Sequence, residues 1–132
     1  MPEIGFPVEV VRGVPVVGAP EEIDITNAAG LRAALLASAA RGHGTFVVDM
    51  TRTRFCDTAG LHALVGAHKR AGAEGGQVLL VIPDAAVLRI LAITGLDRVI
   101  PSFTSLEEAL AQTPGAAIQS RRPGPAAPSG CT

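Results

Sequence analysis

An acid and a hydroxyl stand side by side in the segment Phe55-Cys56-Asp57-Thr58-Ala59-Gly60-Leu61, where a short apolar stretch passes into a helical pattern. Asp and Thr are both favourable N-cap residues, because their side-chain oxygens accept hydrogen bonds from the free N–H groups of a helix's first turn. On spacing alone, a cap at Asp57 or Thr58 explains the segment. Ala59 and Gly60 then allow tight packing behind the cap.

Covalent catalysis by a cysteine with a histidine base is the chemistry that Cys56 and His62 could perform together. Cys56 follows Phe55 at the end of a strand, however, where a small buried hydrophobic side chain is the commoner role for a thiol. We therefore expect Cys56 to be structural. Cys56 and Cys131 are both expected as free thiols, since two cysteines do not make the dense framework of a small secreted domain.

The three histidines, His43, His62 and His68, raise the possibility of a metal site. Zinc ligands must converge on one point at about 2 Å, whereas His62 and His68 lie on different faces of the expected helix. The chain has no Cys-x-x-Cys pair, and its glycines form neither of the common nucleotide-binding patterns. We expect no metal and no cofactor, with His62 on the surface and His68 partly buried.

The composition excludes other classes of protein. The 132 residues are 48% hydrophobic, yet the longest aliphatic run, Val78 to Ile82, is far shorter than the roughly 20 residues of a membrane-spanning helix. Residues 1–5 show no export signal, so we expect a soluble, cytoplasmic protein. The net charge is −1, the charges are scattered and Trp and Tyr are absent, which argues against a nucleic-acid partner.

One domain is expected over residues 1–112, which is long enough to bury a substantial core. Residues 113–132 contain four prolines, three glycines and one large aliphatic residue, Ile118. Such a composition cannot bury enough apolar area to offset the entropy of ordering, so we expect a disordered tail.

Within the domain, short β-branched runs around Arg12-Gly13 predict an N-terminal hairpin, in which the Pro15 nitrogen must face away from a partner strand. Helix caps and apolar spacing then alternate with continuous apolar runs, as in strands that are buried on both faces. The expected strands are 8–11, 14–17, 45–49 and 77–82, and the expected helices begin after Asn27, at Thr58, after Asp84 and at the capping box Ser105 to Glu108. This order predicts an α/β fold: a single mixed, largely parallel sheet with an N-terminal hairpin and about four helices packed against it.

A set of motifs in order resembles the STAS domain of bacterial anti-sigma factor antagonists. The resemblance covers residues 8–112 and includes the segments Glu22-Ile23-Asp24, Val47-Val48-Asp49-Met50, Phe55 to Leu61, Gly75-Gly76-Gln77, Leu91 to Leu96 and Ser105 to Leu110. One such motif is weak support, whereas the ordered set across about four-fifths of the chain is specific.

The resemblance implies a phosphorylation switch. In that family a partner anti-sigma factor, itself a serine/threonine kinase, phosphorylates the hydroxyl residue after the motif's acid, which by position is Thr58. The unmodified antagonist binds the kinase and frees its sigma factor, and a phosphatase resets the cycle. The matching positions assign contact with the kinase to Asp24, Asp57, Ala59, Gly60 and Leu61. Family members often carry two serines where this chain has Thr58-Ala59, so a single hydroxyl is available here.

Two other functions are open at this point. A scaffold or sensory-assembly STAS protein would oligomerise and would never be phosphorylated, whereas the switch is expected to be a monomer or weak dimer when free. Light scattering separates the two. A small enzyme lacks support, because no set of nucleophile, base and acid is visible.

Overall fold

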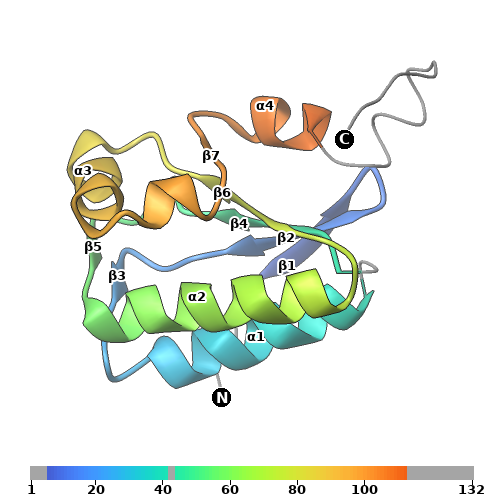
Figure 1. Cartoon of the computed structure of the whole chain (residues 1–132), viewed down its shortest axis with the longest axis horizontal. Helices are drawn as coiled ribbons and strands as arrows, with labels where there is room; N and C mark the ends of the chain where they lie inside the picture. Colours follow the sequence, from blue (N-terminus) through green and yellow to red (C-terminus); the bar gives the residue numbers. More distant parts are fainter. Residues whose placement is uncertain (1–5, 42–43, 113–132) are drawn as a thin grey trace.

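The computed structural model describes residues 6–41 and 44–112. Several expectations fall outside these residues: those for the first five residues, for the helix end at Gly42, for His43, for Cys131 and for a disordered tail over 113–132. The described residues form a central sheet with helices packed against it (Figure 1).

A five-stranded sheet runs through the centre of the molecule. Its strands are β1 (Val8–Val11), β2 (Val14–Gly18), β4 (Phe46–Asp49), β6 (Val78–Val81) and β7 (Ser102–Phe103), and their spatial order is β1-β2-β4-β6-β7. β1 and β2 are antiparallel, and all later neighbours are parallel. The predicted fold class, a largely parallel mixed sheet with an N-terminal hairpin and four helices, is confirmed.

The hairpin follows from its turn residues. Arg12 and Gly13 both have positive φ, 54° and 80°, as the tight two-residue hairpin turn requires. The Gly18 N–H donates to the Pro7 carbonyl at 2.8 Å, in register with the β1–β2 ladder. Hydrogen-bonded and non-hydrogen-bonded pairs alternate in such a ladder, so Pro15, opposite Val10, occupies a non-hydrogen-bonded pair. Its nitrogen therefore faces away from β1, as predicted.

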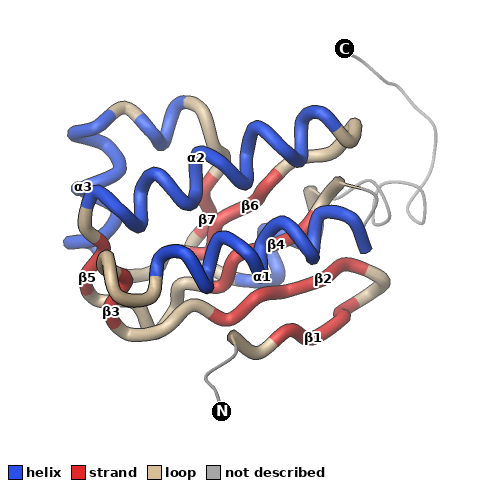
Figure 2. Tube along the Cα trace, turned by 90° about the horizontal axis from the view of Figure 1, so that it is seen from below, coloured by secondary structure: helices blue, strands red, loops and turns tan. Residues whose placement is uncertain are grey.

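Helices cover both faces of the sheet. They are α1 (Ala28–Arg41), α2 (Thr58–Ala73), α3 (Ala85–Thr94) and α4 (Leu106–Ala111), with the 3₁₀ helix η1 (Leu96–Arg98) after α3. The larger core joins one sheet face to α1, α2 and α3, while the smaller core joins the other face to α4 (Figures 1 and 2). Along β4, Phe46 and Val48 enter the larger core and Val47 the smaller one. A strand covered on both faces is continuously apolar for this reason.

Two predicted helix caps form, the second with a shifted partner. The Asp84 carboxylate accepts from the N–H groups of Ala86 and Val87 at 2.8 and 3.2 Å, which caps α3. The Ser105 hydroxyl oxygen accepts from the Glu108 N–H at 3.2 Å, as a capping box predicts.

The second hydrogen bond of the capping box, in which the Glu108 carboxylate would accept from the Ser105 N–H, is replaced. The Glu108 carboxylate accepts from the Thr104 N–H at 3.2 Å and from the Thr104 hydroxyl at 3.0 Å. It therefore binds one residue earlier than the cap itself, where it gains a second hydrogen bond.

A second, two-stranded sheet was not expected. β3 (Glu22–Ile23) and β5 (Phe55–Cys56) pair in parallel where α1 and α2 begin (Figure 1). Strands of two residues are too short to show the alternation from which strands are predicted. This small sheet positions the functional segment.

Candidate functional site

The register of β3 and β5 brings two acidic residues to the same edge. Ile23 pairs with Cys56, and the Asp57 N–H donates to the Ile23 carbonyl at 3.0 Å. Asp24 and Asp57 each follow directly after this pair. The loop before α1 and the start of α2 therefore lie next to each other, although these two acids are 33 positions apart along the chain.

Asp57, rather than Thr58, is the N-cap of α2. Its backbone is extended, with φ −91° and ψ −172°, and its carboxylate accepts from the Gly60 N–H at 3.1 Å. The sequence is compatible with either Asp57 or Thr58 as the N-cap, and the structure shows that it is Asp57. Thr58 is consequently the first residue of the helix.

The Thr58 side chain is exposed to solvent. Its hydroxyl has no hydrogen-bond partner among the residues that the structure describes. Since the capping is done by Asp57, a group added to the Thr58 oxygen would break no hydrogen bond within this part of the chain. The hydroxyl is available for modification in the folded domain.

The loop that carries Asp24 is held by its own hydrogen bonds. The Thr26 hydroxyl and N–H both donate to the Asp24 carboxylate, the latter at 2.9 Å. These two bonds lower the pKa of Asp24 below its ordinary value, so the residue is a stable anion at neutral pH. An acidic group is thus fixed beside the start of α2.

Asn27 precedes α1 but does not cap it in the predicted way. Its side-chain oxygen accepts from the Asp24 N–H at 3.0 Å, and its amide nitrogen donates to the Glu22 carbonyl at 2.8 Å. The Asp24 carbonyl accepts from the Ala28 N–H at 2.8 Å and so takes one free donor of the first turn. Asn27 therefore fixes the loop that carries Asp24, because the loop itself supplies part of the cap.

The other three candidate contact residues differ in exposure. Ala59 and Leu61 are half-buried, and Leu61 packs against the larger core. Gly60 is buried, and a Cβ built on it would lie 2.6 Å from both the Cys56 Sγ and the Ile23 Cγ2. Glycine is thus required here by packing against β3 and β5.

Two exposed apolar side chains flank the site, and their residue types alone do not mark them as surface residues. Ile25, in the loop after Asp24, is 80% exposed, and Phe55, in β5, is 47% exposed. Large apolar residues normally indicate core, so only the tertiary structure shows that these two are on the surface. Exposed apolar groups beside charged ones are typical of protein-binding surfaces.

Cys56 lies beneath the site and is 3% exposed, as predicted for a structural thiol. Burial, and to a lesser degree the Asp57 charge, raise the pKa of Cys56 to about 11. The thiol is therefore neutral and a poor nucleophile at physiological pH. His62 is exposed and His68 is half-buried, as predicted. In residues 6–41 and 44–112 no three His, Cys, Asp or Glu side chains gather as metal ligands would.

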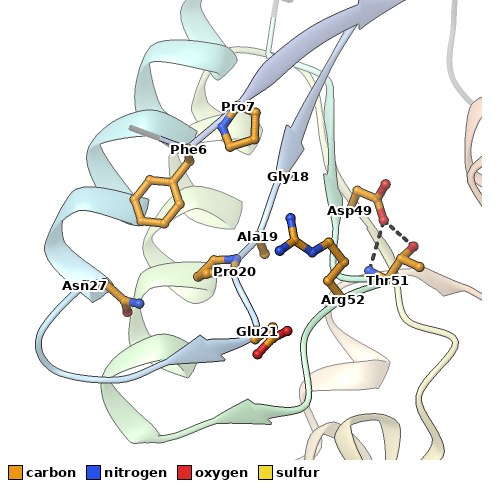
Figure 3. Close-up of a pocket in the computed structure, with 10 residues that line it drawn as sticks. All are labelled: Phe6, Pro7, Gly18, Ala19, Pro20, Glu21, Asn27, Asp49, Thr51 and Arg52. Atoms are coloured by element: carbon orange, nitrogen blue, oxygen red, sulfur yellow. Dashed lines mark hydrogen bonds between the residues drawn. The ribbon is translucent and has the colours of Figure 1, made fainter. Parts of the chain in front are cut away.

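A separate pocket of about 360 Å³ opens where β2 and β4 end (Figure 3). Phe6 and Pro7 form one wall, and the Arg52 side chain extends across the pocket toward Ala19. Asp49 accepts from the Thr51 N–H at 3.0 Å and from its hydroxyl, which orders the turn after β4. Asp49 therefore has a structural role in this turn.

The fold has counterparts among known proteins. The family model described as "STAS domain" matches residues 6–109. The chain therefore belongs to the STAS domain family, as its motifs predict. No helix in the described residues is long and apolar enough to cross a membrane.

Within the STAS family, several similar proteins are anti-sigma factor antagonists. The crystal structure of an anti-sigma factor antagonist from Mycobacterium paratuberculosis is 31% identical, with a TM-score of 0.74, covering 82% of this chain and 92% of that one. A Thermotoga neapolitana protein named anti-sigma factor antagonist is 27% identical over 83% of this chain and 98% of its own length. The antagonist SpoIIAA in its unphosphorylated form shares the fold, with 23% identity and a TM-score of 0.68 over 82% of this chain and 95% of its own.

Proposed function

We propose that this protein is a non-enzymatic, cytoplasmic anti-sigma factor antagonist that is switched by phosphorylation at Thr58. In the unphosphorylated state it binds a cognate anti-sigma serine/threonine kinase, which releases the sigma factor. The kinase then phosphorylates Thr58, binding is lost, and a phosphatase restores the active form. The free protein is a monomer or weak dimer.

One observation carries the proposal: an exposed hydroxyl with no internal hydrogen bond begins α2, between residues suited to contact a partner. Asp24 and Asp57 supply charge, Ile25 and Phe55 supply apolar area, and half-buried Ala59 leaves room for close approach. A solved structure of the Bacillus protein SpoIIAA in its phosphorylated form shares this fold, with a TM-score of 0.62 at 23% identity over 82% of this chain and 98% of that chain.

A phosphate on Thr58 affects binding more than folding. The start of a helix tolerates an anion, because its free N–H groups and dipole favour negative charge. At an interface, a group of about −1.5 to −2 charge beside Asp57 repels acidic neighbours and retains its hydration shell. A cost of about 3 to 4 kcal/mol lowers affinity by two to three orders of magnitude, enough to release a partner.

The test uses the kinases encoded next to this gene. Each is incubated with the protein and ATP, and intact mass together with fragment masses shows whether Thr58 is modified. Binding to the same kinases is measured by calorimetry for the wild type, Thr58→Glu and Thr58→Val. We expect Thr58→Glu to weaken binding more than about tenfold, or ~1.4 kcal/mol, and Thr58→Val to bind without being phosphorylated.

Ala73→Glu is the matched control, because it adds the same charge at an exposed position at the other end of α2. It should bind as the wild type does. If no kinase modifies Thr58 and Thr58→Glu binds normally, the switch is wrong. A defined multimer in light scattering would then favour the scaffold function.

A further inference from the structure

Two basic side chains line a groove that begins beside Thr58. α1 and α2 pack side by side and start at the same end of the molecule (Figures 1 and 2). The groove between them has a volume of about 370 Å³ and is lined by Ala28, Ala29, Arg32, Ala59, His62, Ala63 and Gly66. Arg32 and His62 are the lining residues that can carry positive charge.

His62 shares a helix face with Thr58. The two are four residues apart on α2, and residues with this spacing lie one above the other. Helical side chains also generally lean toward the helix N-terminus, which favours positions of the His62 ring over the turn that holds Thr58. His62 is exposed, and its ring can approach a group attached to the Thr58 oxygen.

Arg32 reaches the same groove from α1. Its guanidinium lies against Gly66, where a Cβ would come within 3.0 Å of Nε and 3.6 Å of Cζ. Within the described part of the chain, neither Arg32 nor His62 has an ion pair or a hydrogen bond from its side chain. Arg32 is exposed and has a long side chain, so it can turn toward the start of α2 without breaking an interaction there.

Nearby positive charge would stabilise a phosphate on Thr58, because acidic residues lie close to it on the side away from the α1–α2 groove. Asp57 immediately precedes Thr58. Glu22 lies in β3, the strand that pairs with β5, and Asp24 directly follows β3. Arg54, just before β5, is the nearest basic residue along the chain on that side. Without added positive charge, two further negative charges would be held beside fixed carboxylates.

We propose that His62 and Arg32 form the recognition site for a phosphate on Thr58, within the same chain. His62 contacts the phosphate one helical turn along α2, and Arg32 approaches it across the groove from α1. The pair offsets the repulsion by Asp57 and Asp24 and holds the phosphate over the α1–α2 groove. This inference rests on Thr58 being the modified residue and adds how the modified state is held.

The experiment bypasses the kinase. Phosphothreonine is placed at position 58 of the full chain by genetic code expansion, and the ³¹P chemical shift is followed against pH. Positive neighbours favour the doubly ionised phosphate, so its titration midpoint should lie below that of the same chain in denaturant, by about 0.5 pH unit. His62→Gln and Arg32→Gln should each raise the midpoint by about 0.3 unit, and Arg32→Lys should keep most of the effect.

Lys69→Gln is the matched control, because Lys69 is an exposed basic residue on α2, eleven positions beyond Thr58. Its midpoint should equal that of the parent. Urea unfolding of the unphosphorylated variants should match the wild type, which separates phosphate recognition from folding. Midpoints that agree within 0.1 unit in the parent, His62→Gln and Arg32→Gln would overturn the inference. Failure of every kinase to modify Thr58 would instead contradict the proposed function, and this titration would still be measurable.

Discussion

At the scale of single residues, Asp57, Thr58 and Gly60 at the start of α2 have different roles. Asp57 caps the helix through the Gly60 N–H, Thr58 keeps its hydroxyl exposed, and Gly60 lets the helix approach β3 and β5. The cap and the close approach are structural. They leave the Thr58 oxygen free of any structural task within the described residues.

Gly60→Ala should destabilise the protein. The added methyl group would lie 2.6 Å from the Cys56 Sγ and the Ile23 Cγ2, both of which are buried and cannot move aside freely. We expect a loss of about 1 to 3 kcal/mol in the free energy of unfolding, measured in urea. Gly72→Ala on the same helix is the control: a Cβ there meets nothing within 4 Å, so this change should stabilise by about 0.5 to 1 kcal/mol. Equal stabilities for the two variants would contradict the packing role of Gly60.

At the scale of elements, the segments that lead into β4 and β6 determine how these two strands begin. Gly44, just before β4, and Gly76, just before β6, lie with their backbones in contact. β4 and β6 pair directly after this contact, in the register Phe46 to Val78. The glycines thus allow the two central strands to start side by side.

Gly76→Ala and Gly75→Ala should separate steric from conformational effects. A Cβ at Gly76 would overlap the Gly44 carbonyl and the Thr45 nitrogen, both of which are backbone atoms, so we expect a loss of about 3 kcal/mol or more. Gly75 has φ +83° but open space around it, so its alanine variant should lose only about 1 kcal/mol. Thermal unfolding measures both. Gly75→Asn should recover part of that loss, because Asn tolerates positive φ.

At the scale of the whole molecule, one sheet separates two cores. The larger core holds α1, α2 and α3 against one face, while α4 covers the other face. The proposed binding surface lies at one end of this arrangement, where β3 and β5 pair. A phosphate there would add charge at the edge of the core, so the proposed switch does not require the fold to change.

The stability of the whole domain should fall between about pH 9 and 11. Folding raises the pKa of Cys56 from 9.0 to about 11, so the unfolded chain loses the thiol proton first as the pH rises. The folded state is then penalised, by on the order of 2 kcal/mol once the pH passes 11. The chain has no Tyr and one lysine, Lys69, so few other side chains titrate in this window. Urea unfolding in a Cys131→Ser background should show the fall, and Cys56→Ala should lack most of it.

Much of the architecture follows from the sequence alone, because it depends on local patterns. Caps at Asp84 and Ser105, turn residues at Arg12-Gly13 and the continuous apolar strands around Val47 and Leu80 each act within a few residues. Their order dictates a largely parallel sheet with helices on its faces. The ordered motifs also indicate the family and place Thr58 in its motif.

The tertiary structure alone decides how the site is assembled. The pairing of β3 with β5 joins residues more than thirty positions apart. It brings Asp24 close to Asp57 and places Cys56 and Ile23 against Gly60. Two-residue strands carry no detectable period, so sequence cannot specify that contact. The choice of Asp57 as the cap likewise depends on where the chain leaves β5. Local patterns therefore determine the elements of this protein, whereas a long-range pairing determines which side chains surround Thr58.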